Sequence, residues 1–252
     1  MRSFWSLALL VAAACAHPAP MMHSHAMNPE LDLEAALTLF RHGEYDLARP
    51  ALRRAQFEMS PAQPEVAEAR YFLAECDFQT SDYAAAAVEF HKVAEEFPSS
   101  EYASLALLRS GDANLRLWRA PELDPEPGQA ALATYQELAG RYPGSGAAAR
   151  AQLHVAQLND WFALKDYKNG MFYFQRHAYD SAIIYFKDII ANYSNTRLVS
   201  DALLRLVDSY RAIRYAEEMR EACTTLRQYY PKTTGLDLHC PRPAAAPAPG
   251  TP

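Results

Sequence analysis

The chain has 252 residues, a net charge of −6 and only 9 glycines, about half the share of roughly 7% that an average protein carries. So few glycines argue against a turn-rich β fold. The acidic balance of 24 Lys and Arg against 30 Asp and Glu, without a basic run, argues against nucleic acid as a partner. The length allows one or two domains with a sizeable core.

The first fifteen residues, MRSFWSLALLVAAAC, have the features of an export signal. One arginine precedes an apolar run that is too short to span a bilayer, which predicts a signal peptide over residues 1–14. Small residues before Cys15 resemble the bacterial lipobox, whose cysteine carries fatty acyl chains such as palmitate. Ala12 stands where that motif prefers leucine, so ordinary cleavage after Ala14 stays open as the alternative.

Residues 15–29 are predicted to be a flexible tether between the lipid and the fold. The stretch HPAPMMHSHAM (17–27) is rich in His and Met, which ligate copper when they surround one centre. Nothing in the sequence enforces such an arrangement, so no metal site is predicted.

The remaining chain repeats a pair of amphipathic helices. The second helix of each pair carries a small or flexible residue, and four positions later a residue that is usually larger, on the same helical face. These segments are 44–61, 82–100, 128–145, 178–196 and 215–233. The first helices are predicted at 33–40, 67–78, 103–118, 148–175 and 199–213.

The second copy best resembles the tetratricopeptide repeat (TPR), with its pattern of small, aromatic and closing proline residues. The matching residues are Ala74, Tyr83, Ala86, Phe90 and Pro98. The resemblance implies an all-α fold over residues 30–235, a right-handed α-solenoid of about five helix pairs.

Three departures from the family's regular repeat are predicted. The proline-free stretch between Pro143 and Pro231 allows one uninterrupted helix over 147–175, and WRAPELDPEPGQ (118–129) must be a loop. Pro50 should kink the second helix of the first copy unless that helix begins there.

The first helices of such a solenoid line a groove suited to an extended or helical peptide. Transfer of the TPR pattern places nine residues in this groove. They are Phe40, Arg41, Glu68, Tyr71, Glu75, Phe78, Asp112, Leu115 and Arg116. An alternative interpretation is that Tyr71 and Phe78 pack between helices instead.

No catalytic or cofactor motif was found: the sequence has no HExxH, GxSxG, SxxK, Walker loop or GxGxxG. Its histidines are scattered, and its carboxylate pairs lie on predicted solvated helix faces. The sequence therefore predicts a non-enzymatic binding protein without a cofactor.

Three cysteines follow Cys15, and in an oxidising compartment two of them can pair. Cys223 and Cys240 are the closest in sequence, and their pairing would pin the tail to the last helix and leave Cys76 as a buried thiol. Residues 236–252 are rich in Pro and Ala and are predicted to be a disordered tail.

The order of parts is similar to that of the BamD family of outer-membrane lipoproteins, over about residues 30–231. The most specific portion is 164–213, which contains KNGMFYFQRHAY, AIIYFKDIIANYSNT and DALLRLVDSYRAI. The resemblance implies a lipid-anchored scaffold of the β-barrel assembly machinery, in the outer membrane and facing the periplasm. Its N-terminal repeats would receive unfolded outer-membrane proteins.

The C-terminal repeats would hold the periplasmic domains of the barrel-forming subunit. The resemblance implies that this partner surface includes Asp201, Tyr210, Arg211 and Arg214. A TPR lipoprotein of another envelope pathway, such as division or pilus assembly, is the alternative. Such proteins often carry an N-terminal coiled coil, and no heptads precede residue 30.

Overall fold

The computed structural model describes residues 29–240, and within that range every regular element is a helix. The predicted signal peptide, Cys15, nearly all of the tether and residues 241–252 lie outside the described residues. The helices are α1 (Pro29–Arg41), α2 (Tyr45–Glu58), α3 (Pro64–Gln79), α4 (Tyr83–Glu96), α5 (Glu101–Leu117), α6 (Glu126–Arg141), α7 (Gly146–Gln175), α8 (Tyr179–Asn192), α9 (Leu198–Ile213), α10 (Ala216–Tyr229) and α11 (Leu236–His239).

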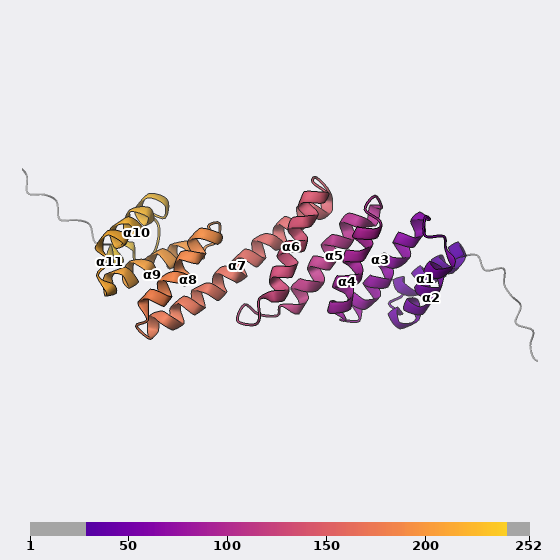
Figure 1. Cartoon of the computed structure of the whole chain (residues 1–252), viewed down its shortest axis with the longest axis horizontal. Coiled ribbons are helices and arrows are strands. Elements are labelled where there is room, and N and C mark those ends of the chain that lie inside the picture. The colour runs from indigo at the N-terminus through magenta and orange to yellow at the C-terminus, as the bar shows by residue number, and fades with distance from the viewer. Residues whose placement is uncertain (1–28, 241–252) are drawn as a thin grey trace, which may run out of the picture.

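The first ten helices form five consecutive pairs arranged in one elongated row (Figure 1). Each helix packs against the next in the chain, and the first helices of neighbouring pairs also touch, so that α5 contacts both α3 and α7. Contacts between neighbours alone are the hallmark of a helical repeat protein. The predicted all-α fold of TPR-like helix pairs is confirmed.

The small-then-large pattern of the second helices forms the core. Ala86 and Phe90 in α4 and Ala182 and Phe186 in α8 are fully buried. Close approach of the paired helix is required at these points, since a Cβ added to Gly170 of α7 would lie 2.6 Å from the Phe186 ring. The alternation of small and large side chains therefore sets the distance between paired helices.

The turn inside each regular pair contains one residue with a left-handed backbone. Gly43, Ser81, His177 and Arg214 occupy this position, with φ between 59° and 79°. Only one of the four is glycine, the residue that adopts this conformation without strain. The turns were therefore harder to locate from the sequence than the helices.

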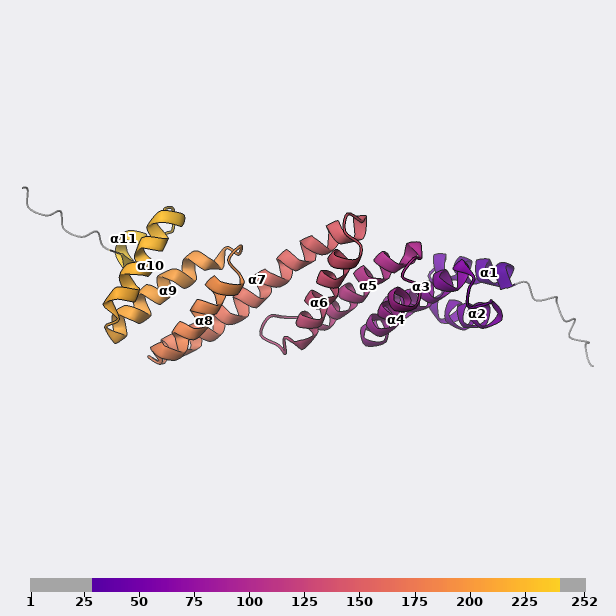
Figure 2. The same ribbon diagram turned by 45° about the horizontal axis from the view of Figure 1, so that its top comes forward.

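The 30-residue α7 confirms the predicted long helix and links the N-terminal helices to the C-terminal ones (Figure 2). It also holds the loop before α6. Lys165 Nζ donates to the Leu123 carbonyl at 2.9 Å, and Lys168, one turn further on, pairs with Glu122. The proline-rich insertion is thus fixed against α7 by two lysines.

Two boundaries differ from the prediction, and of the two alternatives for Pro50 the one in which the helix begins there is wrong. The loop ends at Pro125, because Pro127 lies in the first turn of α6, where no backbone N–H is needed. Pro50 lies inside α2, which begins at Tyr45. The tail predicted from residue 236 begins instead with α11, so residues 236–240 were wrongly assigned to it.

Two carboxyl groups meet between α7 and α8. Asp166 shares a hydrogen bond with Asp188, which also accepts from the side chain of Asn192 at 2.6 Å. Burial and the neighbouring Asp188 raise the pKa of Asp166 to about 7, against the opposing charge of Lys165. Between about pH 4 and pH 7 the folded protein therefore holds a proton here that the unfolded chain releases.

Asp166→Asn is expected to remove a pH dependence of stability. A folded pKa above the unfolded value stabilises the fold at low pH, and this contribution is lost as pH rises from about 4 through 7. The free energy of unfolding of the variant, relative to the wild type, should be about 1–2 kcal/mol higher at pH 8 than at pH 4, allowing for the partial exposure of Asp166. Urea unfolding at both pH values measures this, with Asp180→Asn on the exposed face of α8 as control. Equal differences at both pH values would contradict it.

Candidate peptide-binding groove

A pocket of 560 Å³ lies where α3, α5 and α7 meet, and we call it the inner pocket. Its lining combines aromatic rings with arginines. The lining residues are Phe78, Arg109, Asp112, Leu115, Arg116, Trp118, Arg119, His154, Gln157 and Trp161. Four of the nine predicted groove residues, Phe78, Asp112, Leu115 and Arg116, are brought together here.

Arg109 on α5 is the centre of a partly buried ion-pair network. Its guanidinium donates to both carboxylate oxygens of Glu75 on α3, at 2.5 and 2.7 Å, and to Asp112 at 3.3 Å. It also lies 3.8 Å from the centre of the Phe78 ring. Burial lowers the pKa of Arg109, but the Glu75 hydrogen bond and charge outweigh this, so the pKa is raised. The predicted Glu75 thus positions an arginine and does not itself line the pocket.

Asp112 is held by residues of two further helices, α6 and α7. Tyr135 of α6 donates its hydroxyl to Asp112 Oδ1 at 2.8 Å, and His154 Nε2 of α7 lies 3.6 Å from the same oxygen. The His154 ring stacks on Tyr135 with centroids 5.3 Å apart. Burial, followed by the Asp112 charge, raises the pKa of Tyr135, so this hydroxyl remains a donor.

Tyr71 packs between helices, as the alternative interpretation held. Its ring contacts Phe90 and Tyr102 at centroid distances of 5.4 and 5.1 Å, and its hydroxyl donates to Glu75 at 3.1 Å. Burial raises the pKa of the phenol. Phe78 is also mostly buried, although its edge lines the inner pocket.

The other predicted groove residues lie outside the inner pocket. Glu68 accepts from the Tyr102 hydroxyl at 2.9 Å and lines a separate pocket at the starts of α3 and α5. Phe40 packs against the ring of Phe72, and Arg41 pairs with Glu34 at 2.5 Å on the surface. The nine predicted groove residues therefore do not form one continuous groove.

Sequence reasoning missed six residues of the inner pocket. Helical spacing carries the signal for three of them, because His154, Gln157 and Trp161 repeat at three and four on α7. Arg119 follows the end of α5 at Leu117, so helical spacing does not place it. Trp118 lies beyond the end of α5 and is placed by its packing on Phe162 of α7, at 4.6 Å between ring centroids. That contact depends on tertiary structure and has no local signal.

The sequence model of the family described as Outer membrane lipoprotein (YfiO) matches residues 26–226. The chain belongs to this family. BamD of Neisseria gonorrhoeae is 28% identical over 163 residues, which cover 62% of this chain and 61% of that protein. BamD of Caulobacter vibrioides is 32% identical over 101 residues, covering 40% and 33%. The BamD family predicted from the sequence is confirmed.

The matched stretch spans about three fifths of the length of the first of these relatives. Among solved structures, a thermophilic TPR protein of Thermus thermophilus is 19% identical, with a TM-score of 0.38 over 84% of this chain and 96% of that one. The fold assignment here rests on the helix pairs themselves.

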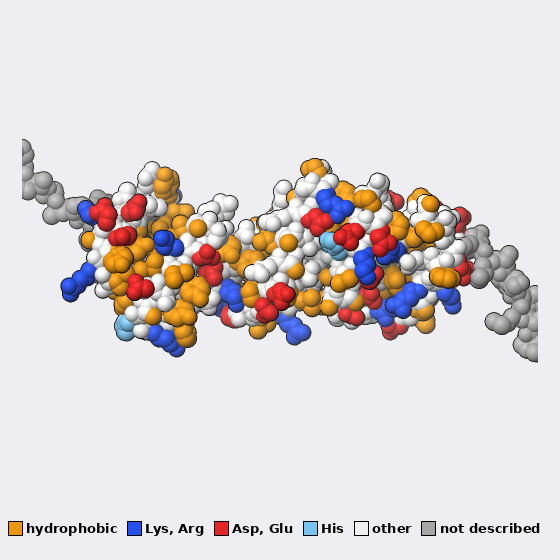
Figure 3. All heavy atoms as spheres, in the orientation of Figure 1, with side chains coloured by type: hydrophobic (Ala, Val, Ile, Leu, Met, Phe, Trp, Pro, Cys, Tyr) orange, Lys and Arg blue, Asp and Glu red, His pale blue; other side chains and the backbone are white. Residues whose placement is uncertain are grey.

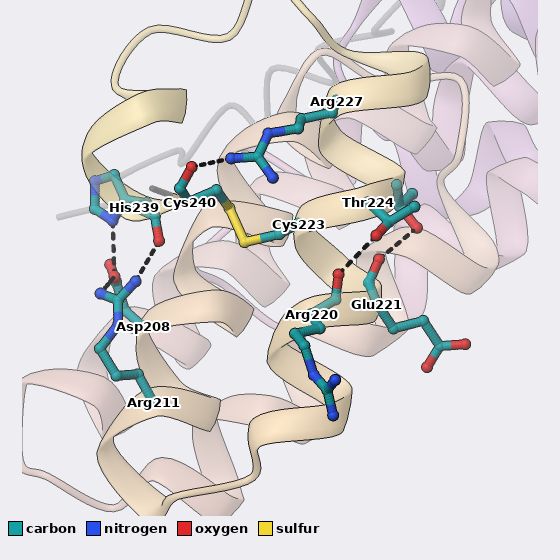
Figure 4. The surroundings of a disulfide bond; sticks show 10 residues. Asp208, Arg211, Arg220, Glu221, Cys223, Thr224, Arg227, His239 and Cys240 are labelled. Atoms are coloured by element: carbon teal, nitrogen blue, oxygen red, sulfur yellow. Dashed lines mark hydrogen bonds and ion pairs between the residues drawn. A yellow bond between two sulfur atoms is a disulfide. The ribbon is translucent and has the colours of Figure 1, made fainter. Parts of the chain in front are cut away.

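Two of the four residues predicted for the C-terminal partner surface of this BamD-family chain are engaged in contacts within the chain itself. Tyr210 is buried and stacks with Tyr215 at 6.4 Å, which corrects its assignment to an exposed surface. Arg211 donates to Asp208 at 3.2 Å and to the His239 carbonyl (Figure 4). Asp201 and Arg214 remain exposed.

The segment that occupies this surface is fixed by a disulfide. Cys223 of α10 is bonded to Cys240 after α11, and Arg227 donates to the Cys240 carbonyl (Figure 4). His239 Nδ1 lies 2.7 Å from Asp208 Oδ1. Cys76 is a buried free thiol, and burial raises its pKa to about 11, so it is unreactive.

Charged and apolar side chains are unequally distributed along the row. Figure 3 shows acidic and basic groups interspersed over the N-terminal helices, with hydrophobic side chains gathered over α8 and α9.

Within residues 29–240 no group of three or more His, Cys, Asp or Glu side chains could hold a metal ion. No helix among those residues is both long and apolar enough to cross a bilayer.

Proposed function

We propose that the chain is a non-catalytic scaffold for the assembly of β-barrel proteins in the outer membrane. Family membership over residues 26–226 is the observation that carries this proposal, because it covers the five helix pairs except for the last three residues of α10. The relatives are named outer membrane protein assembly factors. An elongated row of helix pairs offers several separate surfaces along one chain, as an assembly scaffold requires.

In this proposal the N-terminal repeats receive unfolded outer-membrane proteins at the inner pocket. A pocket of aromatic and arginine side chains gives apolar contact area together with charged donors, a composition typical of peptide-binding hot spots. The C-terminal repeats hold the periplasmic domains of the barrel-forming subunit. Asp201 and Arg214 supply exposed charges for that contact.

Lipid on Cys15 would hold this acidic protein at the outer membrane, facing the periplasm. With a net charge of −6, the chain has no electrostatic attraction of its own to anionic lipid. Labelling of cells with radioactive palmitate tests the anchor, with Cys15→Ala as the control. A mature wild-type protein that never incorporates label would exclude lipidation.

Affinity purification from solubilised envelope tests the scaffold role. The mature protein should co-purify a barrel-forming assembly subunit, and its depletion should lower the levels of outer-membrane β-barrel proteins. Asp201→Ala combined with Arg214→Ala should weaken the co-purification, whereas Arg54→Ala on exposed α2 should not. Normal β-barrel protein levels after depletion, with no assembly subunit recovered, would exclude the proposal.

A further inference from the structure

The outer side of α2 carries apolar side chains that no other part of residues 29–240 covers. The inner side of the helix packs on α1 and α3 and buries Leu52 completely. The outer side exposes four residues at spacings of three, four and three positions, which align along one side of a helix. We call them the outer stripe, and they are Leu47, Pro50, Arg54 and Phe57.

The repeat itself does not require an aromatic residue in the outer stripe. Phe57 is 91% exposed, and it lies five positions after the buried Leu52. At the same distance from their buried large residue, the other second helices have exposed polar or small residues. These are Glu95, Gly140, Ala191 and Gln228. The exposed ring is therefore specific to the first helix pair, and together with Leu47, which is 59% exposed, it indicates a contact outside the fold.

The outer stripe lies at the end of the row that the proposed lipid anchor would hold. The helices α1 and α2 form the first pair of this elongated row (Figure 1). Only residues 16–28 separate Cys15 from Pro29, the first residue of α1. A fully extended chain of this length spans at most about 50 Å, so a lipid on Cys15 would keep the first pair near the bilayer. Tethering raises the effective concentration of the bilayer, so even a weak contact becomes populated.

The charges around the outer stripe favour neither an acidic nor a basic partner. Arg54 is followed one turn later by Glu58, and two turns before it lies Asp46, whose side chain is 89% exposed. The stripe therefore offers apolar area without an excess of positive charge. Leucine and phenylalanine beside an arginine are typical of helices that lie in the headgroup region of a bilayer, where the guanidinium reaches the phosphates.

We propose that the outer stripe of α2 lies on the membrane that holds the lipid anchor. Leu47 and Phe57 enter the boundary between headgroups and acyl chains, and Arg54 donates hydrogen bonds to lipid phosphate oxygens. This second attachment fixes the orientation of the first helix pair, whereas the lipid alone limits only its distance from the bilayer. The inference rests on the proposed lipid anchor at Cys15.

A fluorescent label at residue 57 tests the contact directly. Phe57→Cys in the lipidated mature chain is labelled with nitrobenzoxadiazole, whose emission rises in an apolar environment. The label reacts at this position alone, because the Cys15 sulfur carries lipid, Cys223 and Cys240 are bonded to each other, and the Cys76 thiol is buried. The labelled chain is reconstituted in phosphatidylcholine vesicles, with and without a phospholipid that carries a nitroxide quencher high on its acyl chain.

We expect the nitroxide to lower the emission of the label at residue 57 about twofold or more, since the apolar face of an interfacial helix lies at that depth. The same label at Leu153→Cys on α7, where the leucine is 72% exposed, should lose little emission. Leu47→Ser, added to the chain labelled at residue 57, should reduce the quenching. Ile184→Ser on α8, which removes an equally exposed apolar side chain, should not.

The composition of the vesicles and the density of the protein distinguish other occupants of the stripe. Adding phosphatidylglycerol should leave the quenching unchanged, because the contact is apolar. Quenching in anionic vesicles alone would overturn the apolar contact and assign the attraction to Arg54. Emission that rises with protein density and is not quenched by the nitroxide would show a second copy of the chain on the stripe, and would overturn the proposal as well.

The outcomes also separate the inference from the anchor on which it rests. A chain that floats with the vesicles but is not quenched at residue 57 would overturn the membrane contact and leave the lipid anchor in place. A mature chain that does not float with the vesicles would overturn the anchor, and the contact with it.

Discussion

Gly128→Ala is expected to lower the free energy of unfolding by about 3 kcal/mol, the upper end for overpacking a filled core. Gly128 is buried in the first turn of α6, and an added Cβ would lie 2.1 Å from Cε3 of Trp118. The indole cannot move aside easily, because it is 1% exposed and packs on Phe162 and Trp161. Equilibrium unfolding of the mature chain in urea measures the loss.

Gly140→Ala, in the same helix, is the matched control. A Cβ at Gly140 meets nothing within 4 Å, and alanine favours the helix, so this variant should gain about 0.5–1 kcal/mol. Opposite signs for two identical substitutions in α6 isolate the effect of the contact with Trp118. A destabilisation of equal size at both positions would contradict the assignment of the loss to the contact with Trp118.

The same substitution should also affect ligand binding. Trp118 forms a wall of the inner pocket, so displacing it changes the pocket as well as the core. Gly128→Ala should therefore weaken binding of an unfolded outer-membrane protein under conditions where the chain itself is still folded. Gly140→Ala should not.

The helix pairs were predictable because their signal is local. Ala86 and Phe90 lie four apart on one face, and burial of that face is what forms the pair. The long α7 followed from the lack of prolines between Pro143 and Pro231. What the sequence alone did not predict depends on contacts between distant segments, such as the packing of Trp118 on Phe162.

The candidate site shows the same limit. Glu75 and Arg116 were both predicted groove residues, yet Glu75 is buried against Arg109, whereas Arg116 lines the inner pocket. Repeat register places a side chain on a face but does not show which neighbour neutralises it. Tyr210 was misplaced for a related reason, because its burial depends on Tyr215 of the following turn.

Loss of the disulfide between Cys223 and Cys240 is expected to destabilise the C-terminal helices by about 3 kcal/mol, the value for a closed loop of similar length. The bond spans 17 residues and holds α11 against α9, where His239 lies 2.7 Å from Asp208. Without it, this segment must be ordered by the contact of His239 with Asp208 and by the Arg211 and Arg227 hydrogen bonds to the carbonyls of residues 239 and 240.

Hydrogen exchange of Cys223→Ser with Cys240→Ser measures this loss locally. Exchange should accelerate in α9 and α10, since repeats are stabilised by their immediate neighbours, and should stay unchanged in α1–α4. Reductant added to the wild-type chain should reproduce the pattern.

Cys76→Ala is the matched control: it removes a thiol buried near α1 and α2, so its effect should fall on α1–α4 and spare α9 and α10. Unchanged exchange in α9 and α10 after loss of the bond would mean that the arginine and histidine contacts alone hold α11.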